Sequence, residues 1–254
     1  YLDNADKPLA LRMKGVVVAE VIDYAGTYPF MLGKILADRN DIEFDDVNRG
    51  EQPQQKIHIR NTTVQTLRPQ VMHLPNYLKA DVAPTKVNPG HSGVITLTLD
   101  SRSLPEMGLN QTSVFLGGFP GDKVSADKEI TISAVLLPNF EKLSAHQLAI
   151  APKIELSEME VNLPPFGKKK KQRAVIRLRN VGKSVLDIRS LRMFTSALQV
   201  SLNTTHLAPG AEAKLKITVD AAKLKEARNK PRVLMITNDP DNAKVTININ
   251  VHDK

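Results

Sequence analysis

The sequence contains no cysteine and no tryptophan, and only 11 of its 254 residues are Phe or Tyr. The lack of cysteine excludes a disulfide scaffold, a thiolate metal site and a cysteine nucleophile, but it is compatible with either redox compartment. No apolar run approaches the roughly 18 residues that a membrane-spanning helix needs. The longest, Gly15–Ala19, is followed by Glu20. We therefore expect no transmembrane segment in this chain.

What the sequence does contain is typical of a globular protein. Hydrophobic residues make up 41% of the chain and charged residues 24%, which excludes disorder of the whole. At roughly 150 residues per domain, the length predicts one large domain or two ordinary ones. The chain begins with Tyr1 rather than Met. We therefore expect Tyr1 to be the cut end of a longer precursor with a signal peptide.

Charge is divided unevenly along the chain. Residues 1–150 carry 15 Lys and Arg against 17 Asp and Glu, a net −2, whereas residues 151–254 carry 20 against 10, a net +10. Such a step indicates two units with different surfaces.

Two copies of one pattern are present. The first contains Ile57–Asn61, Asn88–Gly90, Ile95–Asp100 and Leu104, and the second Ile176–Asn180, Ala208–Gly210, Leu215–Asp220 and Leu224. The offset is 119 residues at the asparagines (180 − 61) and 120 at the prolines (209 − 89). A partial third copy at Leu2–Met13 is similar to the segment Ile236–Val251. We expect Leu2–Val18 to be the last strands of a preceding repeat, which dock on the first full repeat or pair with another molecule.

Alternating apolar and polar residues in both copies predict half-buried strands. Together with frequent turn signals, they predict an all-β fold of tandem immunoglobulin-like β-sandwiches, with short helical turns at Ser101–Gly108 and Ala221–Asn229. The predicted units are the end of a preceding repeat plus linker over residues 1–35, one repeat over 36–138, and a linker with a basic repeat over 139–254. One predicted core contains Ile57, Ile59, Leu67, Ile95, Leu97, Leu99, Ile130 and Ile132, and the other Ile176, Leu178, Leu186, Leu215, Ile217, Val219, Val245, Ile247 and Ile249.

At these residues the chain resembles the bacterial immunoglobulin-like repeats of Bacteroidetes cell-envelope proteins, which are similar to Hydin-type (ASH) and PapD/major-sperm-protein-like domains. The resemblance implies an exported, non-enzymatic sandwich, often in tandem. The first copy departs from the pattern with Thr62-Thr63 in place of Val181-Gly182, and with Gly117-Gly118 at a later turn. The residues that carry the resemblance are Phe44, Gly50, Glu51, Asn61, Pro89, Gly90 and Asp100 in one copy, and Leu156, Gly167, Asn180, Gly182, Leu186, Pro209, Gly210, Asp220, Asn238 and Asp239 in the other.

Two apolar segments flank the first repeat. Ala25–Asn40 contains Tyr28, Phe30 and Leu32, which form either a partner surface or a wedge buried between successive sandwiches. The wedge is favoured because apolar clusters beside domain boundaries usually seal them. The second linker, Pro138–Pro152, is more polar and is expected to pack less tightly.

The motifs of common enzymes are absent, so we predict a protein that is not an enzyme and has no cofactor or metal. There is no Gly-x-Ser-x-Gly elbow, phosphate-binding glycine loop or zinc spacing. Strand alternation points His58 outward and turns Asp45 and Asp46 to opposite faces, where they cannot share a proton. The acidic turn Asn238–Asn242 could supply oxygen ligands to Ca²⁺, but a hairpin with Asx-type hydrogen bonds is favoured.

A run of lysines precedes a strand in the second repeat. The segment taken as its counterpart in the first repeat, Glu51–Gln55, carries no positive charge. The run consists of Lys168, Lys169, Lys170 and Lys171, with Arg173 nearby. Its lysines would either attract anionic glycans or lipid headgroups or keep a solvated loop soluble, and both interpretations stay open. Nucleic acid is not expected, because no aromatic residues are interleaved to stack bases.

These observations favour an exported cell-envelope or secreted protein that acts as a binding module or a spacer, in the periplasm or on the surface of a Gram-negative bacterium. Its expected partners are a protein or an anionic glycan or other cell-surface component. The alternative is a PapD-like chaperone or assembly factor that acts through an exposed edge strand. A hydrolase with a site between the domains is a third hypothesis. The oligomeric state stays open.

Overall fold

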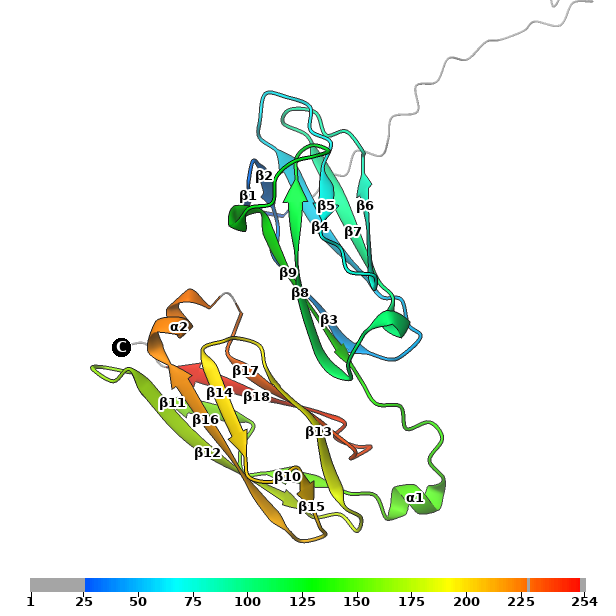
Figure 1. Ribbon diagram of the computed structural model, residues 1–254, viewed down its shortest axis with the longest axis vertical. Helices are drawn as coiled ribbons and strands as arrows, with labels where there is room; N and C mark the ends of the chain where they lie inside the picture. Colours follow the sequence, from blue (N-terminus) through cyan, green and yellow to red (C-terminus); the bar gives the residue numbers. More distant parts are fainter. Residues whose placement is uncertain (1–25, 228, 252–254) are drawn as a thin grey trace, which may run out of the picture.

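A computed structural model describes residues 26–227 and 229–251, which form two β-sandwiches joined by a linker (Figure 1). Strands dominate, so the predicted all-β class is confirmed. The predicted segment Leu2–Val18 lies outside the described residues, and its docking stays a prediction.

The first sandwich packs a five-stranded sheet on a four-stranded one. The first sheet has the order β1-β2-β4-β7-β6 and the second the order β3-β9-β8-β5, with β3 parallel to β9. The elements are β1 (Phe30–Leu32), β2 (Ile35–Ala37), β3 (Asp41–Val47), β4 (Gln54–Asn61), β5 (Gln70–Met72), β6 (Leu78–Ala83), β7 (Ser92–Leu99), β8 (Gly108–Gly117) and β9 (Glu129–Leu136), with short 3-10 turns at Ser101–Ser103 and Ala126–Lys128.

The second sandwich has a similar arrangement. Its sheets have the orders β10-β12-β16-β14 and β11-β18-β17-β13-β15, with β11 parallel to β18. The elements are β10 (Ile154–Leu156), β11 (Glu160–Leu163), β12 (Lys171–Asn180), β13 (Leu186–Met193), β14 (Leu198–Leu202), β15 (His206–Leu207), β16 (Glu212–Asp220), α2 (Ala221–Glu226), β17 (Arg232–Thr237) and β18 (Lys244–Val251).

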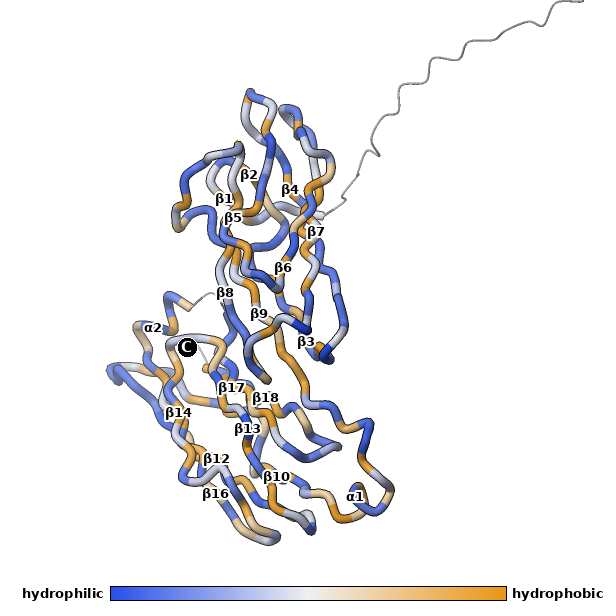
Figure 2. The backbone as a smooth tube through the Cα atoms, turned by 45° about the vertical axis from the view of Figure 1, so that its right-hand side comes forward, coloured by the Kyte–Doolittle hydropathy of each residue, from blue (hydrophilic) through white to orange (hydrophobic). Residues whose placement is uncertain are grey.

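Each sandwich has its own apolar core, and both predicted core sets are confirmed. All eight residues predicted for the first repeat and all nine predicted for the second are buried in the two respective clusters. The physical reason is the period of two along a strand, which places alternate side chains on the inner face. Figure 2 shows the corresponding alternation of hydrophobic and hydrophilic residues along the strands.

A buried asparagine occupies the same position in both sandwiches. The Asn61 side chain is 1% exposed and that of Asn180 is 0% exposed. Asn61 Nδ2 donates to the carbonyl of Val87 at 2.8 Å, and Asn180 Nδ2 donates to that of Leu207 at 2.9 Å. In each copy Nδ2 also donates, at 2.8 Å, to the carbonyl four residues further along. These bonds join the end of one strand to two neighbouring segments and satisfy the polar groups of the buried side chain, which explains why the repeats share an asparagine.

The sequence difference beside these asparagines has a steric cause. A Cβ on Gly182 would lie 2.3 Å from the amide nitrogen of Lys153 and 2.5 Å from the carbonyl oxygen of Ala151. The linker backbone therefore passes directly over Gly182, and only glycine fits there. Thr63 has the same position in the first repeat, and its backbone N–H donates to Asn61 Oδ1 at 2.8 Å, as that of Gly182 does to Asn180 Oδ1 at 3.0 Å.

The apolar segment before the first repeat is part of the first sandwich. β1 and β2 form a hairpin, and β2 pairs with β4. Leu32 and Ile35 are 3% and 2% exposed and belong to the first core. Leu32 and Ile35 therefore pack within the first sandwich, because a strand edge pairs the hairpin and the core beneath buries these side chains. A wedge between successive sandwiches stays a prediction for the exposed Phe30.

The linker after β9 is exposed over residues 144–150. It contains α1 (Ala145–Ala149), in which Ser144 and Gln147 form a reciprocal capping box. Leu148 is 50% exposed, whereas Phe140 and Leu143 are half-buried.

A third apolar cluster joins the two sandwiches. The first sandwich contributes Leu109 and Val135, and the second contributes Phe194, Leu234 and Ile236. In β17 the alternate residues Val233 and Met235 point into the second core, so this strand is apolar on both faces. The first sandwich therefore covers a face of β17 that would otherwise be exposed.

A close backbone approach completes this apolar contact. Gly108 lies at φ +89°, and a Cβ there would be 2.8 Å from Ser190 Oγ of the second sandwich. Glycine at this position therefore allows β8 to begin directly against β13.

Ion pairs surround the contact, and each has its acid on the first sandwich and its base on the second. Acids of the first sandwich meet bases of the second: Glu43 pairs with Arg232, Glu106 with Arg192 at 2.9 Å, and both Asp45 and Asp46 with Lys244. The Arg232 guanidinium also lies 4.0 Å from the centre of the Phe194 ring, in a cation–π contact.

The shared contact of Asp45 and Asp46 corrects the expectation that their side chains face opposite sides. A β-bulge lies between Phe44 and Val47, and Asp46 adopts φ +54°. The bulge turns both carboxylates toward Lys244 Nζ, which lies 2.8 Å from Asp46 Oδ1. Burial lowers the pKa of Lys244, but the hydrogen bonds to the two carboxylates outweigh it, so its pKa is raised above the ordinary 10.5. The ammonium therefore stays charged across the neutral range.

Truncation of a core residue tests the two cores separately. We expect Leu97→Ala and Ile217→Ala each to lower the free energy of unfolding by about 2–5 kcal/mol, because both side chains are at most 1% exposed. Val175→Ala, at a side chain that is 50% exposed, is the control and should change it by less than about 0.5 kcal/mol. Urea unfolding measures all three. Equal, small effects would contradict the core assignment.

A second prediction concerns Asp41, beside the ion pair of Glu43 and Arg232. Its Oδ1 is buried without a hydrogen-bond partner. Burial first, and then the Glu43 carboxylate, raises the pKa of Asp41 above its ordinary 3.8, and Arg232 offsets this only in part. The charged form is therefore disfavoured in the folded protein.

We expect Asp41→Asn to raise the melting temperature at pH 7. The sign follows from linkage: a raised carboxyl pKa costs stability above the folded pKa and nothing below the unfolded one. The gain should shrink as the pH falls toward 3.8. Thermal unfolding at several pH values measures it, with Asp81→Asn at an exposed site as the control. A gain that does not depend on pH would show that the charge of Asp41 is not its cause.

Candidate functional site

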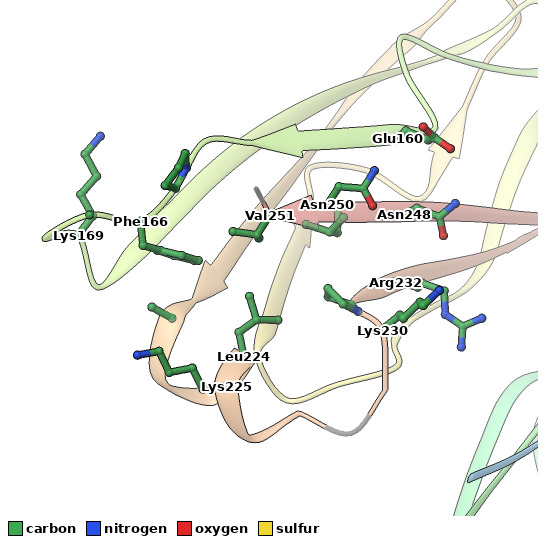
Figure 3. A pocket seen from close by; sticks show the side chains of 15 residues that line it. Glu160, Phe166, Lys169, Leu224, Lys225, Lys230, Arg232, Asn248, Asn250 and Val251 are labelled. Atoms are coloured by element: carbon green, nitrogen blue, oxygen red, sulfur yellow. The ribbon is translucent and has the colours of Figure 1, made fainter. Parts of the chain in front are cut away.

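A cleft of about 1000 Å³ lies at one end of the second sandwich (Figure 3). Its walls are the loop between β11 and β12, helix α2, the start of β17 and the end of β18. Of the predicted lysine run, Lys169 lines this cleft.

Three lysines reach the cleft from three different segments. Lys169 comes from the loop before β12, Lys225 from α2, and Lys230 from the approach to β17. All three are exposed, and the ion pairs found among the described residues involve none of them. Glu160 is the acidic residue of the lining. Among the described residues, the lining therefore carries more positive than negative charge.

The inner surface of the cleft is apolar and amide-bearing. Phe166 and Leu224 are partly buried and pack on the second core. Asn248 and Asn250 come from β18, and Asn250 Nδ2 donates to Asn162 Oδ1 at 3.1 Å. Figure 3 shows the Phe166 and Leu224 side chains between the loop and α2.

Local structure holds the basic loop in place. Gly167 adopts φ +54°, and the Lys169 backbone N–H donates to the Phe166 carbonyl at 2.9 Å, which closes a tight turn. The buried Gln172 side chain donates to the Pro164 carbonyl at 2.6 Å. These bonds, with the fixed φ of the two prolines, fix the backbone of the loop that carries Lys169.

Helix α2 is placed by its own cap. Asp220 accepts hydrogen bonds from the backbone N–H groups of Ala222 and Lys223 at 3.1 and 3.3 Å. Asp100 in the first repeat accepts from the Arg102 N–H in the same way. The shared aspartate of the repeat pattern is thus a helix N-cap.

The structure brings only part of the predicted basic set together. Lys168 and Lys170 are exposed beside Lys169, whereas Lys171 and Arg173 lie in β12 and do not line the cleft. Lys171 is exposed, and its Nζ is 3.9 Å from Oδ2 of the half-buried Asp220, so this pair contributes little stability. Sequence reasoning missed Lys225 and Lys230. The only signal for them was the high lysine content of the second repeat around α2.

The other predicted surface, at Tyr28, Phe30 and Leu32, is divided by the fold. Tyr28 Oη donates to Ser92 Oγ at 3.0 Å, and Phe30 is 37% exposed. Leu32 is in the first core and cannot contact a partner. A partner surface at Tyr28 and Phe30 stays a prediction.

The acidic turn after β17 is stabilised by its own hydrogen bonds. Asp239 is 1% exposed, and its carboxylate accepts from Ile154 N, Asp241 N and Asn242 Nδ2, each at 2.9 Å. These are the expected Asx-type bonds, and the bond to Ile154 also holds the end of the linker. Within residues 26–227 and 229–251, no three His, Asp or Glu side chains are placed to hold a metal ion.

Two histidines have structural partners. His58 Nδ1 lies 3.0 Å from Asp38, which also accepts from the His58 backbone N–H. His206 Nδ1 lies 2.5 Å from Asp187. Both contacts join neighbouring segments of one sandwich. No helix in the described part of the chain is long and apolar enough to cross a membrane.

Comparison with solved structures shows the fold. A protein of unknown function from Porphyromonas gingivalis W83 has a TM-score of 0.68 at 21% identity, and the match covers 87% of this chain and 100% of that one. The CupB2 chaperone of Pseudomonas aeruginosa has a TM-score of 0.29 at 13% identity, covering 83% and 97%. The VesB protease of Vibrio cholerae has a TM-score of 0.28 at 13% identity, covering 41% and 32%. The last two scores are too low to relate either activity to this chain.

Sequence comparison finds a family similarity in the second sandwich. Among curated proteins, none matches the chain significantly. Residues 152–250 match the model of the HYDIN/CFA65/VesB-like, Ig-like domain, which agrees with the resemblance seen in the sequence. That stretch begins where the linker crosses Gly182 and ends in β18. The second sandwich is therefore similar, over residues 152–250, to the HYDIN/CFA65/VesB-like, Ig-like domain.

Proposed function

We propose that this protein is a non-catalytic binding module, which uses the basic cleft of its second sandwich to hold an anionic partner. The observation that carries the proposal is the convergence of Lys169, Lys225 and Lys230, from three separate segments, on one cleft. Like charges brought together without ion-pair partners cost stability, so the placement of these lysines, which form no ion pair with the described residues, favours a role in binding.

The non-catalytic part of the proposal rests on what the ionisable side chains do. Asp239 holds a turn, Asp220 caps a helix, and Glu43 and Asp45 hold the contact between the sandwiches. His58 is held by Asp38. Groups committed to such contacts are poorly placed to transfer protons to a substrate.

Export to the cell envelope, or secretion, is part of the same proposal. Its support is the resemblance of the repeats to immunoglobulin-like domains of envelope proteins, together with the family match of residues 152–250.

A second candidate function is that of a spacer. It is favoured by the contact between the sandwiches, where an apolar cluster and several ion pairs limit relative movement. The two functions are compatible, because a spacer can also present the cleft. The chaperone alternative would use an open sheet edge, such as β6 or β14, which lie at the ends of their sheets.

Replacement of the lysine run tests the binding function. We expect the variant with Lys168, Lys169, Lys170 and Lys171 changed to Gln to elute from heparin at clearly lower salt than the parent protein. The attraction acts over only about 8 Å at physiological ionic strength, so the position of the charges matters. Thermal stability should change little, because among the described residues the run forms one ion pair, the 3.9 Å contact of Lys171 with the half-buried Asp220.

The matched control changes an equal number of exposed cations on the opposite part of the sandwich. Arg177, Arg179, Lys214 and Lys216 lie on the outer face of β12 and β16. Their change to Gln should leave most of the retention. Equal losses in both variants would mean that only net charge matters, and the cleft would then have no special role.

Loosening the contact tests the spacer function. The double change Leu234→Ser and Ile236→Ser removes the apolar face of β17 that meets the first sandwich and leaves the face in the second core intact. Because the chain has no cysteine, Lys79→Cys and Lys214→Cys can carry one spin label in each sandwich. We expect a narrow distribution of label distances that broadens in the double variant. A broad distribution in the parent protein would exclude a rigid spacer.

A further inference from the structure

We propose that the ligand of the basic cleft is an acidic oligosaccharide, bound with its acidic groups on the lysines and a sugar ring on Phe166. This inference rests on the proposed function, since it names the partner class of the same site.

The size of the cleft and the spread of its charges indicate a ligand with several anionic groups. A volume of about 1000 Å³ is at the upper end of the range for small-molecule sites and is far larger than one phosphate or carboxylate needs. Lys169 and Lys225 lie on one side of the cleft and Lys230 on the other (Figure 3). Separated cations match a chain that repeats its charge, whereas a single anion would need them side by side.

The uncharged part of the lining suits a sugar. One face of a pyranose ring carries mainly C–H groups, and an aromatic ring such as Phe166 can pack against it. The amide of Asn250 is oriented by its bond to Asn162, which leaves the Asn250 carbonyl oxygen to accept from a hydroxyl. Asn248 offers a second amide from the same strand.

Other polyanions fit the cleft less well. Nucleic acid binds through several stacked bases, and Phe166 is the single aromatic residue of the described lining. An acidic peptide would gain most by pairing with an open strand edge. Here Asn248 in β18 already pairs with Glu160 of β11 on one side and Arg232 of β17 on the other. The geometry therefore favours a ligand that is recognised by side chains rather than by backbone hydrogen bonds of a sheet edge.

The carboxylate of Glu160 makes the two ends of the cleft differ in charge. It lies at the far end from Lys169 in Figure 3. A ligand with an acid on every unit would meet repulsion there. The cleft is thus better suited to a chain in which a neutral sugar unit lies beside Glu160.

Calorimetry with defined probes tests the inference on the whole chain. We expect oligogalacturonate to bind and the neutral maltohexaose not to bind. Phe166→Leu keeps an apolar side chain on the core and removes the aromatic face, so it should weaken oligogalacturonate binding roughly three- to tenfold and leave polyglutamate unaffected. Lys225→Gln should weaken binding of both anions, and Lys214→Gln of neither. Glu160→Gln should strengthen binding of oligogalacturonate.

Each other outcome has a defined meaning. If polyglutamate binds as tightly as oligogalacturonate and Phe166→Leu affects neither, the partner is an acidic peptide and the glycan inference is wrong. If oligogalacturonate does not bind while heparin retention still depends on Lys168–Lys171, the glycan inference fails and the anion-binding function stands. If retention does not depend on these lysines either, both fail. Phe166→Leu should keep the parent melting temperature to within a few degrees, and if it does not, Asn248→Ala replaces it in the same comparison.

Discussion

The burial of β17 on both faces is the constraint on which the arrangement of this protein depends. Val233 and Met235 lie in the second core, while Leu234 and Ile236 meet Leu109 and Val135 of the first sandwich. A strand with two apolar faces cannot border water at low cost, so the second sandwich needs a cover, and the first sandwich is that cover. The close approach of β8 to the second sandwich at Gly108 belongs to the same contact.

The same contact explains part of the charge step between the halves of the chain. Acids on the first sandwich, such as Glu43 and Asp45, meet bases on the second, such as Arg232 and Lys244. These pairs neutralise part of the negative charge of the first half and part of the positive charge of the second. Lys230 is only two residues from Arg232, yet it faces the cleft, where no acid of the first sandwich pairs with it. One short segment therefore carries both a neutralised and an unneutralised cation.

The sequence predicted the strands, the cores and the all-β class because a half-buried strand has a period of two, and that signal is local. Ile217 and Leu97 could be assigned to cores without knowing any partner. The contact between the sandwiches gave a weaker signal, since an unbroken apolar run such as Val233–Ile236 fits a strand in any deeply buried position. The bulge that turns Asp45 and Asp46 toward one lysine could not be predicted from the sequence. A single residue at positive φ reverses the alternation of side chains on which the prediction relied.

The cleft illustrates the same limit for function. Lys168–Lys171 stand out because they are adjacent in the sequence. Lys225 and Lys230 are far from them in the sequence and line the same cleft as Lys169 only through the fold. Their convergence depends on two local devices, the turn at Gly167 and the Asp220 cap, and each of these belongs to the repeat pattern. The first repeat has the same kind of cap at Asp100, followed by only a short 3-10 turn. It has Glu51 at the position of Lys170, because the Ser101 N–H donates to the Glu51 carbonyl as the Ala221 N–H donates to that of Lys170. The shared scaffold thus supplies the walls of the cleft, and the charges that distinguish the second sandwich were added to it at positions that the fold does not require.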